Sequence, residues 1–151
     1  MEYRELNETH LKDMATLFVK AYELIEAFKE EPWNEEWTEE IAYKRLAQMI
    51  NCDGFYGMVA IKDSRIVGMI FGRQEQYYNG VIFEIKEFCV DITLGIKGLG
   101  TQVYNVFENR LKEMGIKEIV LNTCRSDKTI GFYEKQGFEV SDSIVVMNKK
   151  V

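Results

Sequence analysis

The chain has 151 residues, of which 46% are hydrophobic and 29% are charged. This composition is that of one ordinary globular domain, and it excludes a disordered or fibrous protein. Lys and Arg number 19 against 25 Asp and Glu, so the formal net charge is −6 at pH 7. Because proteins that grip nucleic-acid phosphates carry the opposite balance, we expect no nucleic-acid partner.

Membrane, secretory and metal-binding signals are missing from the sequence. No apolar run reaches the roughly 20 residues of a membrane span, and the first residues lack the basic-then-apolar order of a secretory signal. Three cysteines (Cys52, Cys89 and Cys124) without a Cys-x-x-Cys pair are typical of buried thiols in a reducing compartment. The single histidine, His10, argues against a His-based triad or a His-rich metal site. We therefore predict a soluble cytoplasmic domain with no metal and no membrane contact.

The first third of the chain has helical periodicity after a short strand. The strand is predicted over residues 3–6, and Thr9 is expected to cap a helix that runs over residues 11–25. Thr38 is expected to cap a second helix, whose apolar stripe covers residues 41–50.

The rest of the chain alternates between strand and helix periods. A helix over residues 103–114 is closed by Gly115, and Asp127 could cap a short helix that ends at residue 136. The predicted strands cover residues 55–61, 66–74, 81–91, 117–123 and 143–149. The order β-α-α-β-β-β-α-β-α-β predicts a single α+β domain over residues 1–151.

Negative charge is concentrated in residues 21–40, which hold eight glutamates, one lysine, the only proline and both tryptophans. One interpretation is two solvated helix ends with a turn between them. The other is one wall of a pocket for a cationic ligand, in which carboxylates attract the cation and indole faces contact it. The candidate wall consists of Trp33, Glu35, Glu36 and Trp37.

A glycine-rich loop, GIKGLG at residues 95–100, lies between a predicted strand and a predicted helix. A helix N-terminus that follows such a loop presents several backbone N–H groups and a partial positive charge, which suits a phosphate. The same spacing also occurs in ordinary tight turns. The loop is neither a Walker motif nor the dinucleotide-binding fingerprint, because the glycine order and the following residues differ.

The glycine loop and a second motif, FYEKQGF at residues 132–138, together resemble the GNAT family of acyl-CoA-dependent N-acetyltransferases. In that family a Gln/Arg-x-x-Gly-x-Gly/Ala loop binds the pyrophosphate of coenzyme A, and a Phe-Tyr-Glu-Lys-x-Gly-Phe segment follows. Gly95 replaces the usual Gln or Arg, and Ser126 stands where an Asn often precedes the second motif. The resemblance implies a mixed central sheet with helices on both faces, in agreement with the predicted order.

By this resemblance the chain transfers an acetyl group from acetyl-CoA to an amine by direct attack. Tyr133 matches the family tyrosine whose hydroxyl faces the coenzyme sulfur, which implies that it is the general acid. The residues implied at the coenzyme are Cys89, Val90, Gly95, Ile96, Lys97, Gly98, Leu99, Gly100, Thr101 and Ser126.

Two carboxylates, Glu84 and Glu87, are candidates for the general base. Strand alternation puts them on opposite faces unless the strand is bulged between them, and members of the family usually carry such a bulge. Glu87 occupies the position common in the small-molecule branch, and Glu84 resembles the base of the histone-acetylating branch. A water chain is a third alternative, and either carboxylate could instead be a solvent-facing partner of Lys86.

The acidic tryptophan-containing segment favours a small cationic amine as the acceptor, similar to an aminoglycoside or a polyamine. A peptide or protein N-terminus is an alternative acceptor. A second hypothesis, which Gly95 favours, is a non-catalytic module that binds acyl-CoA as a sensor or structural ligand. The oligomeric state stays open, and a homodimer could share the strand over residues 143–151 as an edge.

Overall fold

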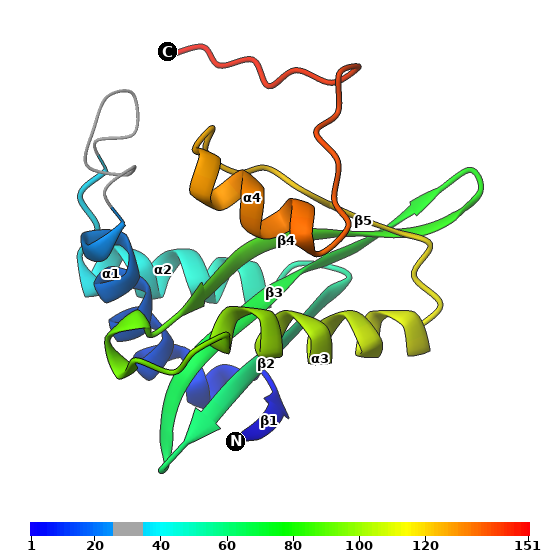
Figure 1. Ribbon diagram of the computed structural model, residues 1–151. Helices are drawn as coiled ribbons and strands as arrows, with labels where there is room; N and C mark the ends of the chain where they lie inside the picture. Colours follow the sequence, from blue (N-terminus) through cyan, green and yellow to red (C-terminus); the bar gives the residue numbers. More distant parts are fainter. Residues whose placement is uncertain (26–34) are drawn as a thin grey trace.

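The computed structural model describes residues 1–25 and 35–151. Within these residues, five strands form one sheet and four α-helices lie on its two faces (Figure 1). The strands are β1 (Glu2–Glu5), β2 (Phe55–Lys62), β3 (Arg65–Tyr77), β4 (Gly80–Val90) and β5 (Glu118–Leu121). The helices are α1 (Leu11–Leu24), α2 (Glu39–Ile50), α3 (Leu99–Glu113) and α4 (Asp127–Lys135), with 3₁₀ turns η1 (Glu8–His10) and η3 (Ile92–Leu94).

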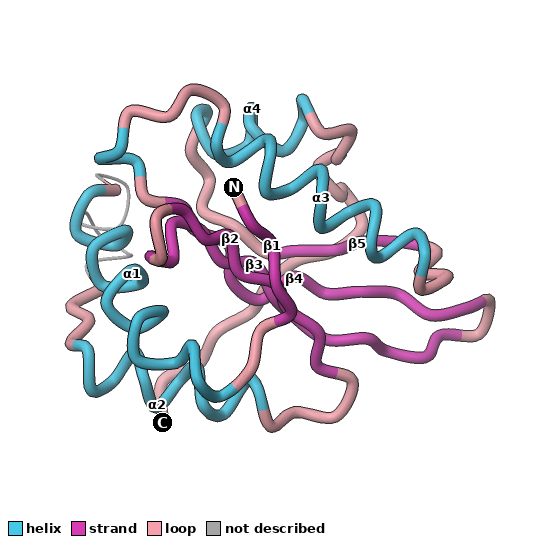
Figure 2. Tube along the Cα trace, turned by 90° about the horizontal axis from the view of Figure 1, so that it is seen from below, coloured by secondary structure: helices cyan, strands magenta, loops and turns pink. Residues whose placement is uncertain are grey.

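The sheet is mixed, as predicted. Strands β1 to β4 pair antiparallel in chain order, and β5 pairs parallel with β4 at the edge. Figure 2 shows the sheet between a layer of α1 and α2 and a layer of α3 and α4. The α+β class with helices on both faces is therefore confirmed.

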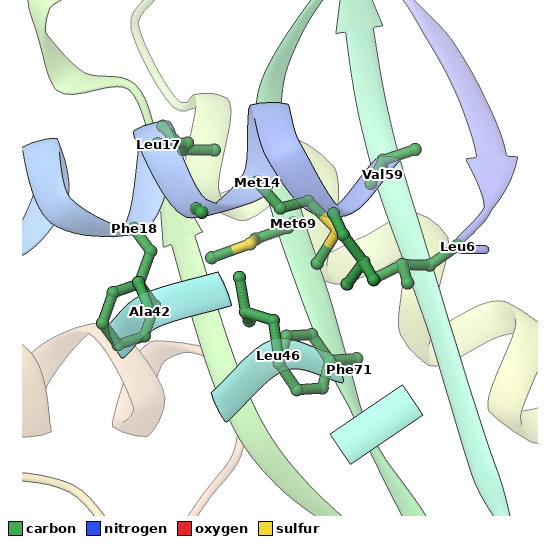
Figure 3. Packing of buried hydrophobic residues seen from close by; sticks show 11 residues of the cluster. Leu6, Met14, Leu17, Phe18, Ala42, Leu46, Val59, Met69 and Phe71 are labelled. Carbon is green, nitrogen blue, oxygen red and sulfur yellow. The ribbon is translucent and has the colours of Figure 1, made fainter. Parts of the chain in front are cut away.

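The face covered by α1 and α2 carries the first of two hydrophobic clusters. Apolar residues of α1 recur at three- and four-residue spacing, so one stripe of the helix is buried against the sheet. Phe18 and Met14 of α1 pack with Leu46 of α2 over Met69 and Phe71 of β3 (Figure 3).

The opposite face carries the second cluster, under α3 and α4. Tyr104 and Phe107 of α3 are fully buried against Phe83 and Ile85 of β4. Phe132 of α4 packs at the margin of the same cluster. Alternate residues of β4 thus fill this core, which leaves the others for the α1–α2 face.

Strand β4 contains a β-bulge at Lys86. Phe71 of β3 pairs with Glu87 and its neighbour Gly72 pairs with Ile85, so Lys86 has no opposite residue in β3. A Cβ at Gly72 would lie 1.8 Å from the carbonyl oxygen of Glu84, so only glycine permits this approach of the strands. Because of the bulge, Glu87 turns to the face of Phe71, toward α1 and α2.

The strands β4 and β5 separate beyond the bulge. Their parallel pairing covers Ile82 to Ile85 only, opposite Glu118 to Leu121. The last residues of β4, through Val90, continue along β3 without a partner in β5. One edge of this stretch is thereby available to a ligand that binds as an added strand.

The predicted strand over residues 143–149 is wrong in this structure. The chain after α4 runs away from the sheet as an extended arm (Figure 1), and Val145 and Met147 are 77% and 88% exposed. Its apolar run has strand propensity, but propensity produces a strand only where a neighbouring strand accepts its hydrogen bonds.

Two of the three predicted N-terminal caps are also wrong. Asn7 rather than Thr9 caps the first helical turn, because η1 precedes α1 and shifts the start of the helix. Ser126 rather than Asp127 caps α4, whereas Thr38 caps α2 as predicted. None of the described helices is both long enough and apolar enough to cross a membrane.

Candidate active site

Glu87 lies at the bulge of β4, where β4 and β5 separate, and its side chain is only 10% exposed. Arg45 of α2 reaches across the sheet face to this carboxylate. Its Nε and Nη2 lie 2.9 and 2.8 Å from the same oxygen, Oε1. Charge-assisted bonds of this kind are short and strong, so they fix the orientation of the carboxylate.

The pKa of Glu87 lies above its ordinary value. Burial raises the pKa, while the charge and the hydrogen bonds of Arg45 lower it. Glu35 raises it further, and Lys86 lowers it. A buried carboxylate with a raised pKa is a better proton acceptor near neutral pH than an exposed glutamate.

Tyr133 of α4 is close enough to Glu87 for the negative charge of Glu87 to act on its hydroxyl group. Its ring packs edge-on against Phe132 and Phe138, with ring centroids 5.2 and 5.5 Å apart. Burial raises the pKa of Tyr133 to about 12, and the negative charge of Glu87 contributes to the shift. The phenol therefore stays protonated at neutral pH and can donate a proton.

The two predicted carboxylates, Glu84 and Glu87, differ in what they contact. The bulge places both on the α1–α2 face, but the side chain of Glu84 forms an ion pair with Lys86. The charge of Glu87 acts on both Tyr133 and Tyr22 of α1. Glu87 therefore acts on two tyrosines near the end of β4, whereas Glu84 is paired with its neighbour on the same strand.

The glycine loop presents uncapped backbone at the start of α3. Gly95 and Gly98 adopt left-handed backbone angles, with φ of 64° and 71°. Gly98 is the N-cap of α3, and no side chain caps this N-terminus. A Cβ at either glycine would meet no atom within 4 Å, so backbone conformation, not packing, requires glycine there.

Gly100 and Phe132 connect the two sequence motifs. A Cβ at Gly100 would lie 3.3 Å from the ring of Phe132, so the small residue lets α4 approach the start of α3. Gln136, just after α4, donates to Oγ1 of Thr101 at 3.4 Å. The loop thus presents the N-terminus of α3, which no side chain caps, beside the helix that carries Tyr133, and this arrangement fits a pyrophosphate.

The other residues implied at the coenzyme have different environments. Cys89 and Val90 end β4 in the stretch that β5 leaves unpaired. Burial raises the pKa of Cys89 well above its ordinary value, so this thiol is not a thiolate nucleophile. Ser126 accepts the N–H of Thr129 at 3.2 Å as the cap of α4. Within the loop, Leu99 is buried, Ile96 is half-buried and Lys97 is exposed.

The acidic segment is divided by the structure. Trp33 lies outside the described residues, and Glu36 is exposed. Trp37 packs on the rings of Phe18 and Tyr22 of α1, and its indole N–H donates to Glu35 at 2.9 Å. Glu35 and Trp37 therefore border the site, since Glu35 acts electrostatically on both Glu87 and Tyr22.

Arg45 and Tyr22 are site residues that the sequence reasoning missed. Both lie in ordinary amphipathic helices, and Arg45 is 42 residues from Glu87 in the chain. No motif or spacing marks them. Across residues 1–25 and 35–151, no group of three or more His, Cys, Asp or Glu side chains is placed to hold a metal ion.

The sequence model of a family described as "Acetyltransferase (GNAT) domain" matches residues 14–149. The chain belongs to this acetyltransferase family. The match covers both motifs and every described residue of the site named above, so the expected resemblance is confirmed. No curated protein matches the chain in sequence.

Several solved structures share the fold at low sequence identity. A possible acetyltransferase from Clostridium difficile 630 has a TM-score of 0.79 and 17% identity, over 99% of this chain and 97% of that one. An aminoglycoside antibiotic 6′-N-acetyltransferase from Acinetobacter haemolyticus has a TM-score of 0.73 and 16% identity, over 100% of this chain and 99% of that one. A ribosomal-protein-alanine N-acetyltransferase from Brucella melitensis has a TM-score of 0.72 and 14% identity, over 99% of this chain and 100% of that one. At these identities the likeness concerns the fold alone.

Proposed function

We propose that this GNAT-family protein transfers the acetyl group of acetyl-CoA to a primary amine of a small cationic substrate. The observation that carries the proposal is a buried carboxylate, Glu87, whose charge acts on a protonated phenol, Tyr133, in the helix that packs against the glycine loop. Direct transfer requires a group that accepts the ammonium proton and one that protonates the departing thiolate. Glu87 and Tyr133 supply these two groups.

The reaction balances with these two residues. Glu87 takes one proton from the ammonium, directly or through a water, and the free nitrogen attacks the thioester carbonyl. The carbon–sulfur bond breaks, and the leaving thiolate takes a proton from Tyr133. The second nitrogen proton restores the phenol, and the proton on Glu87 passes to solvent.

The coenzyme is proposed to bind along the free edge of β4 and at the loop. Backbone groups of Cys89 and Val90 would pair with its pantetheine arm in the stretch that β5 leaves free. The amides of residues 96–101 would hold the pyrophosphate, and the exposed Lys97 would add positive charge. Ser126 supports this site indirectly, because it caps the helix of Tyr133.

A cationic acceptor is supported by the residues that border Glu87 on the α1–α2 face. The carboxylate of Glu35 supplies negative charge, and Tyr22 and Trp37 supply aromatic faces. Aminoglycosides and polyamines are amines of this class. A peptide N-terminus is the alternative acceptor, and the likeness in fold to a protein-alanine acetyltransferase fits it equally.

A non-catalytic acyl-CoA-binding module is the second candidate, because Gly95 replaces the usual Gln or Arg of the loop. A binding module needs the backbone of the loop but not the proton-transfer pair. The two candidates therefore differ in what they require of Tyr133.

The test combines thermal unfolding with a thiol-release assay. Acetyl-CoA at 100 times its Kd should add about 2.7 kcal/mol of stability and raise the Tm by several degrees. Thiol release is then measured with kanamycin, spermidine and a peptide with a free N-terminus. Tyr133→Phe should lower kcat by roughly 10²- to 10⁴-fold while the Tm shift persists.

Tyr104→Phe is the matched control, because this ring packs on the same Phe138 at 5.8 Å. It should keep the wild-type kcat. A Tm shift with no thiol release from any amine would favour the binding module. No shift at millimolar acetyl-CoA would remove both candidates.

We also propose a cytoplasmic location, which suits three free cysteines. A homodimer that shares the C-terminal arm stays a prediction.

A further inference from the structure

Arg45 contacts Glu87 with two of its three nitrogens. An arginine fork usually meets a carboxylate with two nitrogens on two oxygens. Here Nε and Nη2 both approach Oε1, at 2.9 and 2.8 Å. Two nitrogens of the guanidinium therefore fix the position of this oxygen.

The ion pair lies below the surface, between α2 and β4. The side chain of Arg45 is 35% exposed and that of Glu87 is 10% exposed. An ion pair on an open surface contributes little to stability, but a carboxylate this buried depends strongly on its partner for its charge. Removing Arg45 would leave an uncompensated buried charge, which Glu87 would relieve by taking up a proton.

The groups that act on Glu87 and its surroundings come from every element packed around it. Arg45 and Lys86 favour the ionised form of Glu87, and Glu35 disfavours it. The charge of Glu87 acts in turn on Tyr22 of α1, Tyr133 of α4 and Cys89 of β4. Arg45 is the cation that contacts the carboxylate from the α1–α2 layer, so it is the group whose removal changes this balance most.

We propose that Arg45 is a positioning residue, which holds the carboxylate of Glu87 through two contacts at Oε1 in the orientation that accepts the proton of the acceptor amine. The inference rests on the proposed acetyl transfer with Glu87 as base. Arg45 acts on the reaction through Glu87 alone. Substitutions of Arg45 can separate two properties of the base. Its charge can be maintained by any cation at this place, whereas its orientation requires the two nitrogens of a guanidinium.

The experiment measures the pH dependence of kcat/KM and of kcat for three variants. Arg45→Gln removes both the charge and the fork, Arg45→Lys keeps the charge only, and Arg4→Gln is the matched control. Arg4 belongs to an exposed Arg–Glu pair on β1, with Glu2, far from the site in the sheet order. Thermal unfolding of each variant, with and without acetyl-CoA, verifies that it folds and binds the coenzyme.

Arg45→Gln should move the acidic limb of the kcat/KM profile upward by about one to three pH units, because loss of a nearby opposite charge raises a carboxyl pKa by that amount. Arg45→Lys should bring the acidic limb most of the way back to its wild-type pH. Its kcat should stay lowered, since a single ammonium does not orient the carboxylate. Arg4→Gln should match the wild type in both.

Wild-type profiles for both Arg45 variants would overturn the inference and leave Arg45 as a structural contact between α2 and β4. A lowered kcat with no movement of the acidic limb would overturn it as well. Failure of the proposed function is a different result, namely an unmodified chain that binds acetyl-CoA but acetylates no amine.

Glu87 labelled with ¹³C at its carboxyl carbon gives a readout that does not depend on turnover. Its titration midpoint should rise in Arg45→Gln and stay near the wild-type value in Arg45→Lys. An unchanged midpoint in Arg45→Gln would overturn the inference even if no substrate is found.

Discussion

The two faces of the sheet differ in which parts of the chain they offer to the proposed ligands. On the α3–α4 face, the glycine loop offers backbone N–H groups at the start of α3, with no side-chain cap. On the α1–α2 face, Arg45, Tyr22 and Glu35 from separate segments converge on Glu87. The bulge at Lys86 joins the two, because it turns Glu87 to one face while the end of β4 leads into the loop.

This contrast explains why only one half of the candidate site can be recognised in the sequence. Backbone recognition needs glycines at fixed spacing, and that spacing survives as a motif. Side-chain recognition needs only that the right groups meet in space, so their sequence positions carry no fixed pattern. Four changes to the chain test this contrast: one alters the bulge, one alters each face, and one alters neither face.

The largest effect is expected from Gly72→Ala, which acts on the bulge itself. The new Cβ would lie 1.8 Å from the carbonyl oxygen of Glu84, which is backbone and cannot rotate away. We expect a loss of about 3 kcal/mol in the free energy of unfolding, at the upper end for overpacking. A displacement of Glu87 by about 1 Å should also lower kcat by roughly 10²-fold.

Urea unfolding and thiol release measure these two effects. Gly131→Ala is the control, because a Cβ at this position in α4 would meet no atom within 4 Å. It should raise stability by about 0.5–1 kcal/mol, as expected for Gly to Ala inside a helix. Equal stability of the two variants would contradict the close approach of β3 and β4 at the bulge.

Gly98→Ala acts on the α3–α4 face alone. Alanine disfavours the left-handed backbone of Gly98 by about 1–2 kcal/mol, so the loop should relax and weaken acetyl-CoA binding about tenfold. The KM for the amine should not change. Isothermal titration with acetyl-CoA measures the loss.

Gly115→Ala is the matched control, at the opposite end of the same helix. Its φ of 80° imposes the same strain, and a Cβ there also meets no atom within 4 Å. Both variants should lose similar stability, but only Gly98→Ala should bind coenzyme less well. Equal coenzyme affinities would remove the loop from the binding site.

Glu35→Gln acts on the α1–α2 face alone. Glu35 is exposed, so loss of its charge should raise the KM for a cationic amine by only about two- to fivefold, the range of exposed charge pairs. The acetyl-CoA affinity should stay unchanged. Glu36→Gln should change KM less, because Glu35 alone of the two accepts the indole N–H of Trp37. Unchanged kinetics in both variants would remove this segment from the acceptor site.

The smallest effect is expected from deleting residues 143–151, which lie on neither face. Because these residues are exposed, the free energy of unfolding should change by less than about 0.5 kcal/mol. A larger loss would mean that the arm pairs as a strand in solution. Light scattering on the same samples tests the homodimer: a dimeric full chain that becomes monomeric on truncation would support the arm as its shared edge.

The helices and the inner strands could be predicted from periodicity, because each buries one face and its apolar residues repeat accordingly. The lack of a strand over residues 143–149 could not be predicted, because this apolar run has the pattern of a strand although no strand forms there. Thr9 and Ser126 show the same limit at helix ends. Several polar residues near a helix start can serve as its cap, and the local path of the chain selects one.

The family, the glycine loop and the position of Tyr133 could be recognised from the sequence alone, because these depend on residues close together in the chain. The different partners of Glu84 and Glu87, and the contact of Arg45 with Glu87, became visible only in the folded chain. The face to which Glu87 points depends on one unpaired residue, Lys86, opposite the junction of Phe71 and Gly72. A bulge changes the face to which the following residue points, and its place is set by how two strands approach each other rather than by either strand alone.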